Sequence, residues 1–140
     1  MPRESPKLAV QVSASFPSAD IFGIKLVNGK ATQALVSFSN HEPEPVTVNF
    51  IGGSLWTSDF DPQGSRIVRN LTATRYNVEI LAGEKQRLTY NFATELHPQE
   101  LRLNLATILT DSQGVFHSFP AFNETVAIVE PETSIFDPQM

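Results

Sequence analysis

The stretch 101–128, LRLNLATILTDSQGVFHSFPAFNETVAI, decides the fold. Leu101, Leu103 and Leu105 alternate with other residues, a pattern that buries one face of a β-strand and exposes the other. The polar segment Asp111–Gly114 then supplies the residue types of a tight turn, and apolar residues resume after it. Two strands joined by a short polar turn predict an antiparallel β-hairpin.

The same two-residue alternation recurs through most of the chain. It is seen in Leu8/Val10/Val12, Phe22/Ile24/Leu26, Val36/Phe38, Val46/Val48/Phe50, Tyr76/Val78/Ile80, Leu88/Tyr90/Phe92 and Val126/Ile128. Turn-forming residues separate these runs, at Asn28-Gly29, Asn40–Pro45, Gly52-Gly53, Asp61–Gly64 and Ala82-Gly83. Short strands at a spacing of about 8–12 residues predict an all-β fold. We therefore expect an immunoglobulin-like or fibronectin-III-like antiparallel β-sandwich of about eight or nine strands.

The chain divides into three parts. Residues 1–19 are expected to be an N-terminal lead-in that includes a candidate first strand, 20–129 the sandwich, and 130–140 a linker that leaves the domain. Pro120 interrupts an apolar run. Because proline cannot donate a hydrogen bond to a sheet, we expect its strand to be at an edge, bulged or broken there.

Composition excludes several classes of protein. The chain has no cysteine, so disulfides and thiolate metal sites are excluded. Its net charge is -5. Binding to nucleic acid requires a basic stripe, and the only loose group of cations, Arg66, Arg69 and Arg75, is interpreted as a solvated strand face. No apolar run approaches the roughly 18 residues that a membrane helix needs.

Metal binding is not indicated by the histidines. His41 and His97 fall in predicted loops, and His117 falls in a predicted strand. A zinc site needs three or four converging ligands, and no HxH or HExxH spacing occurs. We therefore expect surface or half-buried histidines without a metal.

Catalytic motifs are also absent. Ser54, after Gly52-Gly53, is the nearest approach to a nucleophile motif, but no GxSxG is present. The carboxylate pairs Glu42/Glu44 and Asp59/Asp61 lie in predicted turns, where acidic residues solvate a loop. The sequence therefore predicts a protein that is not an enzyme and uses no cofactor.

Two features of the sequence indicate sites of glycosylation or protein contact instead of catalytic residues. Asn70-Leu71-Thr72 and Asn123-Glu124-Thr125 are N-glycosylation acceptor sequences, so Asn70 and Asn123 are candidate glycan sites of a secreted or lumenal protein. The single tryptophan, Trp56, is either a contact for another protein or a core residue.

Several segments in order resemble the alpha subunit family of the translocon-associated protein complex. The motif 36–40, VSFSN, is similar to the family's VGFTN, and 69–73, RNLTA, is similar to QNFTA. Further along, 111–116, DSQGVF, resembles DLNGNVF, and 121–126, AFNETV, resembles AVFNQTV. The two candidate glycan sites lie where family sites lie. The differences are those expected of a distant member, such as a fungal one.

The resemblance implies a function. It implies the lumenal domain of a single-pass type I membrane protein of the endoplasmic reticulum, followed by a membrane helix. The implied partners are the protein-conducting channel, the other subunits of the complex and nascent polypeptides. Vertebrate members carry an acidic segment associated with calcium, but 5–20 is not acidic here, so calcium binding is not carried over. The alternative is a secreted or cell-surface adhesion module, since sandwiches host many functions.

Overall fold

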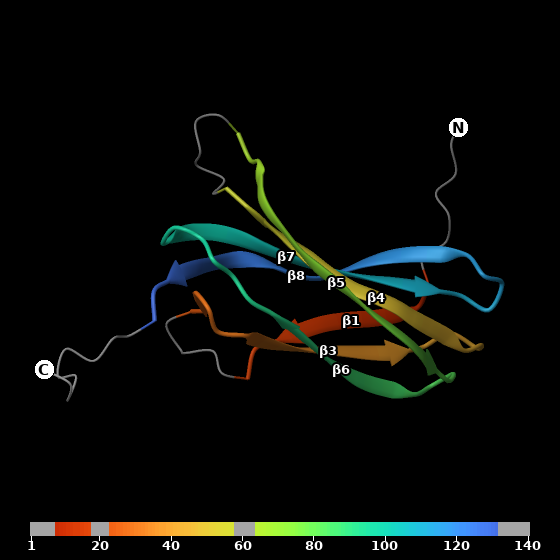
Figure 1. Ribbon diagram of the computed structural model, residues 1–140. Coiled ribbons are helices and arrows are strands. Elements are labelled where there is room, and N and C mark those ends of the chain that lie inside the picture. The colour runs from red at the N-terminus through yellow and green to blue at the C-terminus, as the bar shows by residue number, and fades with distance from the viewer. Residues whose placement is uncertain (1–7, 18–22, 58–63, 132–140) are drawn as a thin grey trace, which may run out of the picture.

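Two β-sheets packed face to face form the molecule (Figure 1). The structure is a computed structural model that describes residues 8–17, 23–57 and 64–131. Its eight strands are β1 (Val10–Ser15), β2 (Lys25–Val27), β3 (Thr32–Asn40), β4 (Val46–Trp56), β5 (Ile67–Ile80), β6 (Lys85–Phe92), β7 (Gln99–Thr110) and β8 (Phe116–Val129). One sheet has the order β1-β3-β6 and the other the order β2-β8-β7-β4-β5. The predicted all-β sandwich is confirmed. Only the short β2, which pairs with β8, is parallel to its neighbour.

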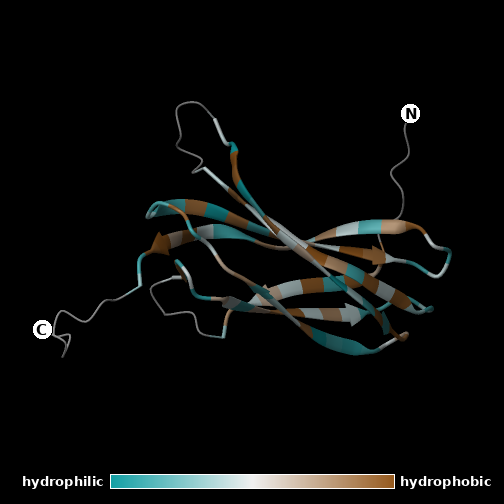
Figure 2. Ribbon diagram, viewed as in Figure 1, coloured by the Kyte–Doolittle hydropathy of each residue, from teal (hydrophilic) through white to brown (hydrophobic). Residues whose placement is uncertain are grey.

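The core lies between the sheets. Leu101, Leu103 and Leu105 of β7 are all buried there, and Val36 and Phe38 of β3 project toward them from the other sheet. Apolar and polar residues alternate along these strands, as Figure 2 shows by the change of colour from one residue to the next. The alternation therefore places the large aliphatic side chains inside, as the sequence predicts.

The glycine pair at positions 52 and 53 is not a turn. The sequence predicts a turn there, but both residues lie within β4, which continues to Trp56. Gly53 pairs with Leu71 of β5 on one side and with Leu105 of β7 on the other. A Cβ atom at position 53 would lie 2.6 Å from the carbonyl oxygen of Asn104, so Gly53 is required by close packing within the strand.

Phe50 is also placed differently from the prediction. The alternation assigns it to the core with Val46 and Val48, but a bulge between Val48 and Phe50 shifts the register by one residue. Ile51 takes the core position instead, fully buried. The ring of Phe50 lies on the outer face, with the guanidinium of Arg75 5.6 Å from its centre. One extra residue in a strand reverses the sidedness of all that follow it.

Pro120 behaves as expected. It lies in β8 opposite Ala106, and the pairing with β7 slips between Leu105 and Ala106, which makes a bulge. Among the described residues, β2 pairs with β8 only at Ala127–Val129, so the other edge of β8 at Pro120 has no partner strand. Pro120, which has no N–H to donate, thus lies at an irregular point of the β7–β8 ladder in a strand with one open edge.

Two buried asparagines fasten the two ends of the sandwich. At the end of β3, Asn40 donates from Nδ2 to the carbonyls of Glu44 and Ile80, each at 3.0 Å, and its Oδ1 accepts from the amide of Glu42 at 2.8 Å. At the opposite end, Asn28 makes a comparable set of bonds to Leu96 and its neighbours. Each asparagine side chain supplies hydrogen bonds to loop backbone groups that have no partner in the sheets.

A pair of tyrosines closes one side of the sandwich. Tyr76 of β5 donates its hydroxyl to the carbonyl of Thr89 in β6 at 2.5 Å. Tyr90 of β6 donates in the opposite direction, to the carbonyl of Thr72 in β5 at 2.7 Å. Each hydroxyl thus occupies a backbone acceptor on the facing strand, and these two strands belong to different sheets.

This pair predicts a loss of stability in alkali. Burial, with a smaller contribution from Tyr76, raises the pKa of Tyr90 to about 12, and burial also raises the pKa of Tyr76 above 10. Unfolded tyrosines lose their protons near pH 10. Between pH 10 and 12 the unfolded chain therefore holds fewer protons than the folded chain, and the free energy of unfolding falls, by an amount on the order of 1–2 kcal/mol.

Urea unfolding between pH 9 and pH 12 measures the effect, and the variant Tyr90→Phe is its control, because it removes most of the pH dependence. The chain contains only two tyrosines. Phenolate absorbance of the native protein should therefore rise in two steps, with that of Tyr90 near pH 12. Ionisation of both tyrosines together near pH 10 would contradict the prediction.

Candidate functional site

Asn70 and Asn123 lie in one row across the outer face of the five-stranded sheet. The register pairs Asn70 of β5 with Ser54 of β4, Ser54 with Asn104 of β7, and Asn104 with Asn123 of β8. Residues directly opposite one another in a sheet project from the same face. Three strand spacings of about 4.8 Å place the two asparagines roughly 14 Å apart.

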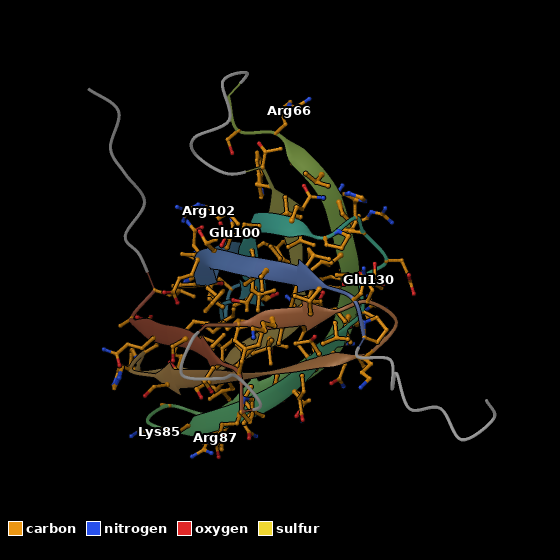
Figure 3. The ribbon with its side chains drawn as sticks, turned by 90° about the vertical axis from the view of Figure 1, so that its left-hand side faces the viewer. Arg66, Lys85, Arg87, Glu100, Arg102 and Glu130 are labelled. Carbon is orange, nitrogen blue, oxygen red and sulfur yellow. The ribbon has the colours of Figure 1, made fainter. Side chains whose placement is uncertain are left out.

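Both asparagines are exposed, and their contacts leave the amide nitrogens accessible. The guanidinium of Arg102, from Nη1, donates to Oδ1 of Asn123 at 3.0 Å and to its carbonyl at 3.4 Å. The side-chain oxygen is therefore engaged and the nitrogen, the atom to which a glycan is attached, is not. Arg102, which makes these contacts, is labelled in Figure 3.

Trp56 lies at the end of β4, two residues after Ser54, and is half-buried on the outer face. Its indole Nε1 donates to the hydroxyl of Ser54 at 2.8 Å. The ring is not part of the core between the sheets, so the core alternative is ruled out. Its role as a contact for another protein stays a prediction. Ser54 accepts this bond on an open sheet face, away from the three histidines.

The histidines occupy separate places. His41 is exposed and its Nε2 lies 3.1 Å from the hydroxyl of Ser39, and His97 is exposed in the loop before β7. His117 of β8 is half-buried, with Nε2 2.9 Å from the carboxylate of Asp111. Within the three described ranges, no group of three or more His, Asp or Glu residues converges as a metal site.

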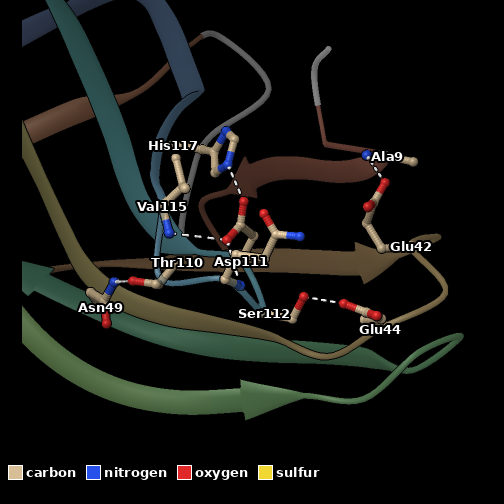
Figure 4. A network of polar contacts seen from close by, with 10 residues as sticks. Ala9, Glu42, Glu44, Asn49, Thr110, Asp111, Ser112, Val115 and His117 are labelled. Atoms are coloured by element: carbon tan, nitrogen blue, oxygen red, sulfur yellow. Dashed lines mark hydrogen bonds and ion pairs between the residues drawn. The ribbon is translucent and has the colours of Figure 1, made fainter. Parts of the chain in front are cut away.

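Asp111 organises the turn between β7 and β8 (Figure 4). Its Oδ1 accepts from the amides of Gln113 at 2.8 Å and Val115 at 3.0 Å, while Oδ2 meets His117. The hydrogen bond from His117, followed by those from the backbone, lowers the pKa of the Asp111 carboxyl. These contacts explain why this polar sequence forms a tight turn, and they are structural.

The carboxylates predicted to solvate a loop make bonds of their own. Glu42 accepts from the amide of Ala9 at 2.7 Å, and Glu44 accepts from the hydroxyl of Ser112 (Figure 4). Both therefore tie the 41–45 loop to neighbouring segments. The pair Asp59 and Asp61 lies outside the described residues.

The three arginines of the loose basic group are exposed. They do not share one strand face, because Arg69 pairs with Leu55, whose side chain is buried between the sheets, whereas Arg75 lies on the outer side. Arg69 and Arg75 lie on β5, and Arg66 precedes it. Arg75 lies over Phe50 and is thus on the outer face of the five-stranded sheet. They do not form a stripe of the length that nucleic acid would need.

A second surface was not recognised from the sequence. The outer face of the three-stranded sheet carries Gln11, Ser13, Ser37, Ser39, Lys85 and Arg87, which line a groove of about 780 Å³ and are called the polar groove here. The signal in the sequence is the alternation of serine and glutamine with buried residues in β1 and β3. It becomes a site only when the register brings three strands together.

The fold and surfaces define a class of protein first: a β-sandwich domain with polar outer faces and two exposed glycan acceptor sequences. Residues 16–140 match the family described as translocon-associated protein (TRAP), alpha subunit. The chain belongs to that family, whose members are non-enzymatic subunits associated with the translocon. None of the curated protein sequences compared with the chain matches it.

Solved structures share the fold at low sequence identity. The PapD-like domain 7 of human CEP192 is 13% identical, with 94% of each chain covered and a TM-score of 0.53. Spo0M, a sporulation control protein from Bacillus subtilis, is 13% identical over 89% of this chain and 50% of its own, with a TM-score of 0.57. The C-terminal domain of wzt is 9% identical over 90% of this chain and 77% of its own, with a TM-score of 0.59. These likenesses support the immunoglobulin-like sandwich and carry no function.

Proposed function

We propose that this chain is the non-catalytic lumenal domain of an endoplasmic reticulum membrane protein that sits beside the protein-translocation channel. It assists the translocation or topology of nascent chains through contacts with the channel and with other subunits of its complex. The observation that carries the proposal is membership of the alpha subunit family over 16–140. The exposed row that contains Asn70 and Asn123 supports it, because glycans are added in the lumen.

The end of the sandwich from which β8 leaves is proposed to face the membrane. The backbone amide of Asn28 donates to the carbonyl of Val129 at 2.9 Å, which fixes the last residue of β8. Residues 130–140 are proposed to link the sandwich, which includes β1 (Val10–Ser15), to a membrane helix. No helix among the described residues is long and apolar enough to cross a bilayer. Eleven extended residues reach at most about 35–40 Å.

This short reach determines how the domain acts. A tethered domain meets nearby membrane partners at a high effective concentration, so weak contacts are occupied. Trp56 lies near the same end of the sandwich, at the end of β4, and is proposed as one of these contacts. Tryptophan is common among residues that dominate binding energy.

Expression of the membrane-anchored protein in microsomes of its host tests the proposal. Glycosidase treatment is expected to remove two glycans, and each of Asn70→Gln and Asn123→Gln should remove one. Asn104→Gln is the matched control, because Asn104 lies in the same row but outside an acceptor sequence. Cross-linking is then expected to capture the channel. Unglycosylated protein would contradict a lumenal domain of either kind. Glycosylated protein that is secreted and never cross-linked to the channel would support the adhesion module instead.

A further inference from the structure

We propose that the polar groove on the three-stranded sheet binds an acidic polypeptide segment in extended conformation. The proposal rests on the proposed function for its biological setting, since it names the chemistry of one partner of the domain. The geometry of the groove itself comes from the register of three strands.

Two adjacent cross-strand rows form the floor of the groove. Gln11 of β1 lies opposite Ser39 of β3, and Ser39 lies opposite Lys85 of β6. In the next row on the same face, Ser13 lies opposite Ser37, and Ser37 lies opposite Arg87. Each row therefore runs from an uncharged side chain at one edge, over a serine hydroxyl, to a cation at the other edge.

The two cations are available for a ligand. Lys85 and Arg87 are exposed on β6, where Figure 3 labels them at the far side of the sandwich from Arg102. Among the described residues neither makes an ion pair, and no carboxylate lines the groove. Two nearby acids are turned elsewhere: Glu42 accepts from the amide of Ala9, and Glu84 accepts from that of Leu81 at 3.1 Å.

The spacing of the cations selects an extended ligand. Lys85 and Arg87 are two residues apart in one strand, which separates them by roughly 6.5–7 Å. Alternate side chains of an extended peptide have the same separation, so carboxylates at every second position reach both cations at once. The hydroxyls of Ser13 and Ser37 and the amide of Gln11 donate to the carboxylate oxygens that remain. The hydroxyl of Ser39 already lies 3.1 Å from Nε2 of His41.

Charge and position favour this sheet face over the outer face of the other sheet. The chain as a whole has a net charge of -5, so an acidic segment is repelled by most of its surface and attracted to this local cationic edge. The outer face of the other sheet carries the row with Asn70 and Asn123, where the two glycans proposed above would stand in the way. The polar groove is the sheet face that remains open.

Binding of labelled decapeptides to the full chain tests the proposal. The probe alternates Glu and Ser, and its neutral counterpart alternates Gln and Ser. Fluorescence anisotropy at low salt is expected to show binding of the Glu peptide only, weakened as salt rises. In the spectrum of the isotope-labelled protein, the shifted amides should belong to β1, β3 and β6.

Charge reversal supplies the decisive comparison. The double variant Lys85→Glu/Arg87→Glu should lose at least about tenfold in affinity for the Glu peptide and should gain binding of a Lys–Ser peptide. The matched control, Lys25→Glu/Arg69→Glu, makes the same change in net charge on the other sheet and should retain binding.

Equal loss in both double variants, or no binding of the Glu peptide at millimolar concentration, would overturn the proposal. Stronger binding through the same two cations to vesicles containing phosphatidylserine would replace the peptide by a lipid surface and would equally overturn it. Any of these results can occur together with two glycans and a channel cross-link in microsomes. Failure here is therefore distinguishable from failure of the proposed function.

Discussion

Replacing Gly53 with alanine is expected to lower the free energy of unfolding by about 3 kcal/mol, the upper range for overpacking in a core. A Cβ atom at this position would lie 2.6 Å from the carbonyl oxygen of Asn104 and 2.7 Å from Cδ2 of Leu105. The carbonyl belongs to the backbone of β7, the central partner of β4, and cannot retreat without spreading the sheet. The side chain of Leu105 is fully buried and has no other place to go.

Gly52→Ala is the matched control in the next position of the same strand. Its Cβ would face the outer side of the sheet, where the nearest atom is Cβ of Ala73 at 3.3 Å. A small shift relieves that contact, and alanine also restricts the unfolded chain, so the net change should lie within about 1 kcal/mol of zero. Urea unfolding followed by the fluorescence of Trp56 measures both variants. Equal stability of the two variants would show that β4 and β7 do not approach as closely as described.

The same glycines show where sequence reasoning stops. A Gly-Gly pair between apolar runs is a turn signal in most chains, and nothing local distinguishes it from a strand that two neighbours approach closely. The distinguishing fact is the presence of Leu71 and Leu105 on either side, and both are distant in sequence. Phe50 was misplaced for a related reason, because a bulge at one residue reverses parity without a signal in the hydrophobic pattern.

Local chemistry was predictable where it follows from a single residue. Proline lacks an N–H, so the irregularity at Pro120 could be predicted before its neighbours were known. The turn at 111–114 follows from an aspartate that accepts two amides of its own loop. The exposure of Asn70 and Asn123 fits the sequence, but their position in one row does not follow from it, since it depends on the register of four strands.

The polar groove is the clearest case of a site that sequence alone does not reveal. Ser37, Ser39, Lys85 and Arg87 are ordinary exposed residues of two separate strands. They form one groove only because strand pairing brings together residues that are 46 to 50 positions apart, such as Ser39 and Lys85. The charge of the whole chain, which is acidic, even suggests the opposite sign for a binding surface.

The largest polar effect is expected at Asn28, at the end of the sandwich from which β8 leaves. Its Nδ2 donates to the carbonyl of Leu96 at 2.6 Å and to the carboxylate of Glu130 at 3.3 Å. Its Oδ1 accepts from the amide of Leu96 at 3.0 Å and from the hydroxyl of Thr94 at 3.1 Å. The residue is only 6% exposed, so all four bonds are made where water has little access.

Asn28→Asp is therefore expected to lower the free energy of unfolding by about 3–5 kcal/mol at neutral pH, because a carboxylate cannot donate and would face a carbonyl and the carboxylate of Glu130. The burial and the acceptors around the new carboxyl raise its pKa in the folded state above that in the unfolded state. The loss of stability should therefore shrink as the pH falls, because the protonated carboxyl regains one donor, and should grow as the pH rises. Asn91→Asp, an exposed change on β6, is the control and should stay within about 0.5 kcal/mol of the parent. Urea unfolding at pH 4 and pH 7 measures both variants. Hydrogen exchange at the amide of Leu96 reports directly on its hydrogen bond to Asn28. A loss for Asn28→Asp that does not depend on pH, with slow exchange kept at Leu96, would mean that Asn28 does not hold Leu96 and Glu130 through these hydrogen bonds.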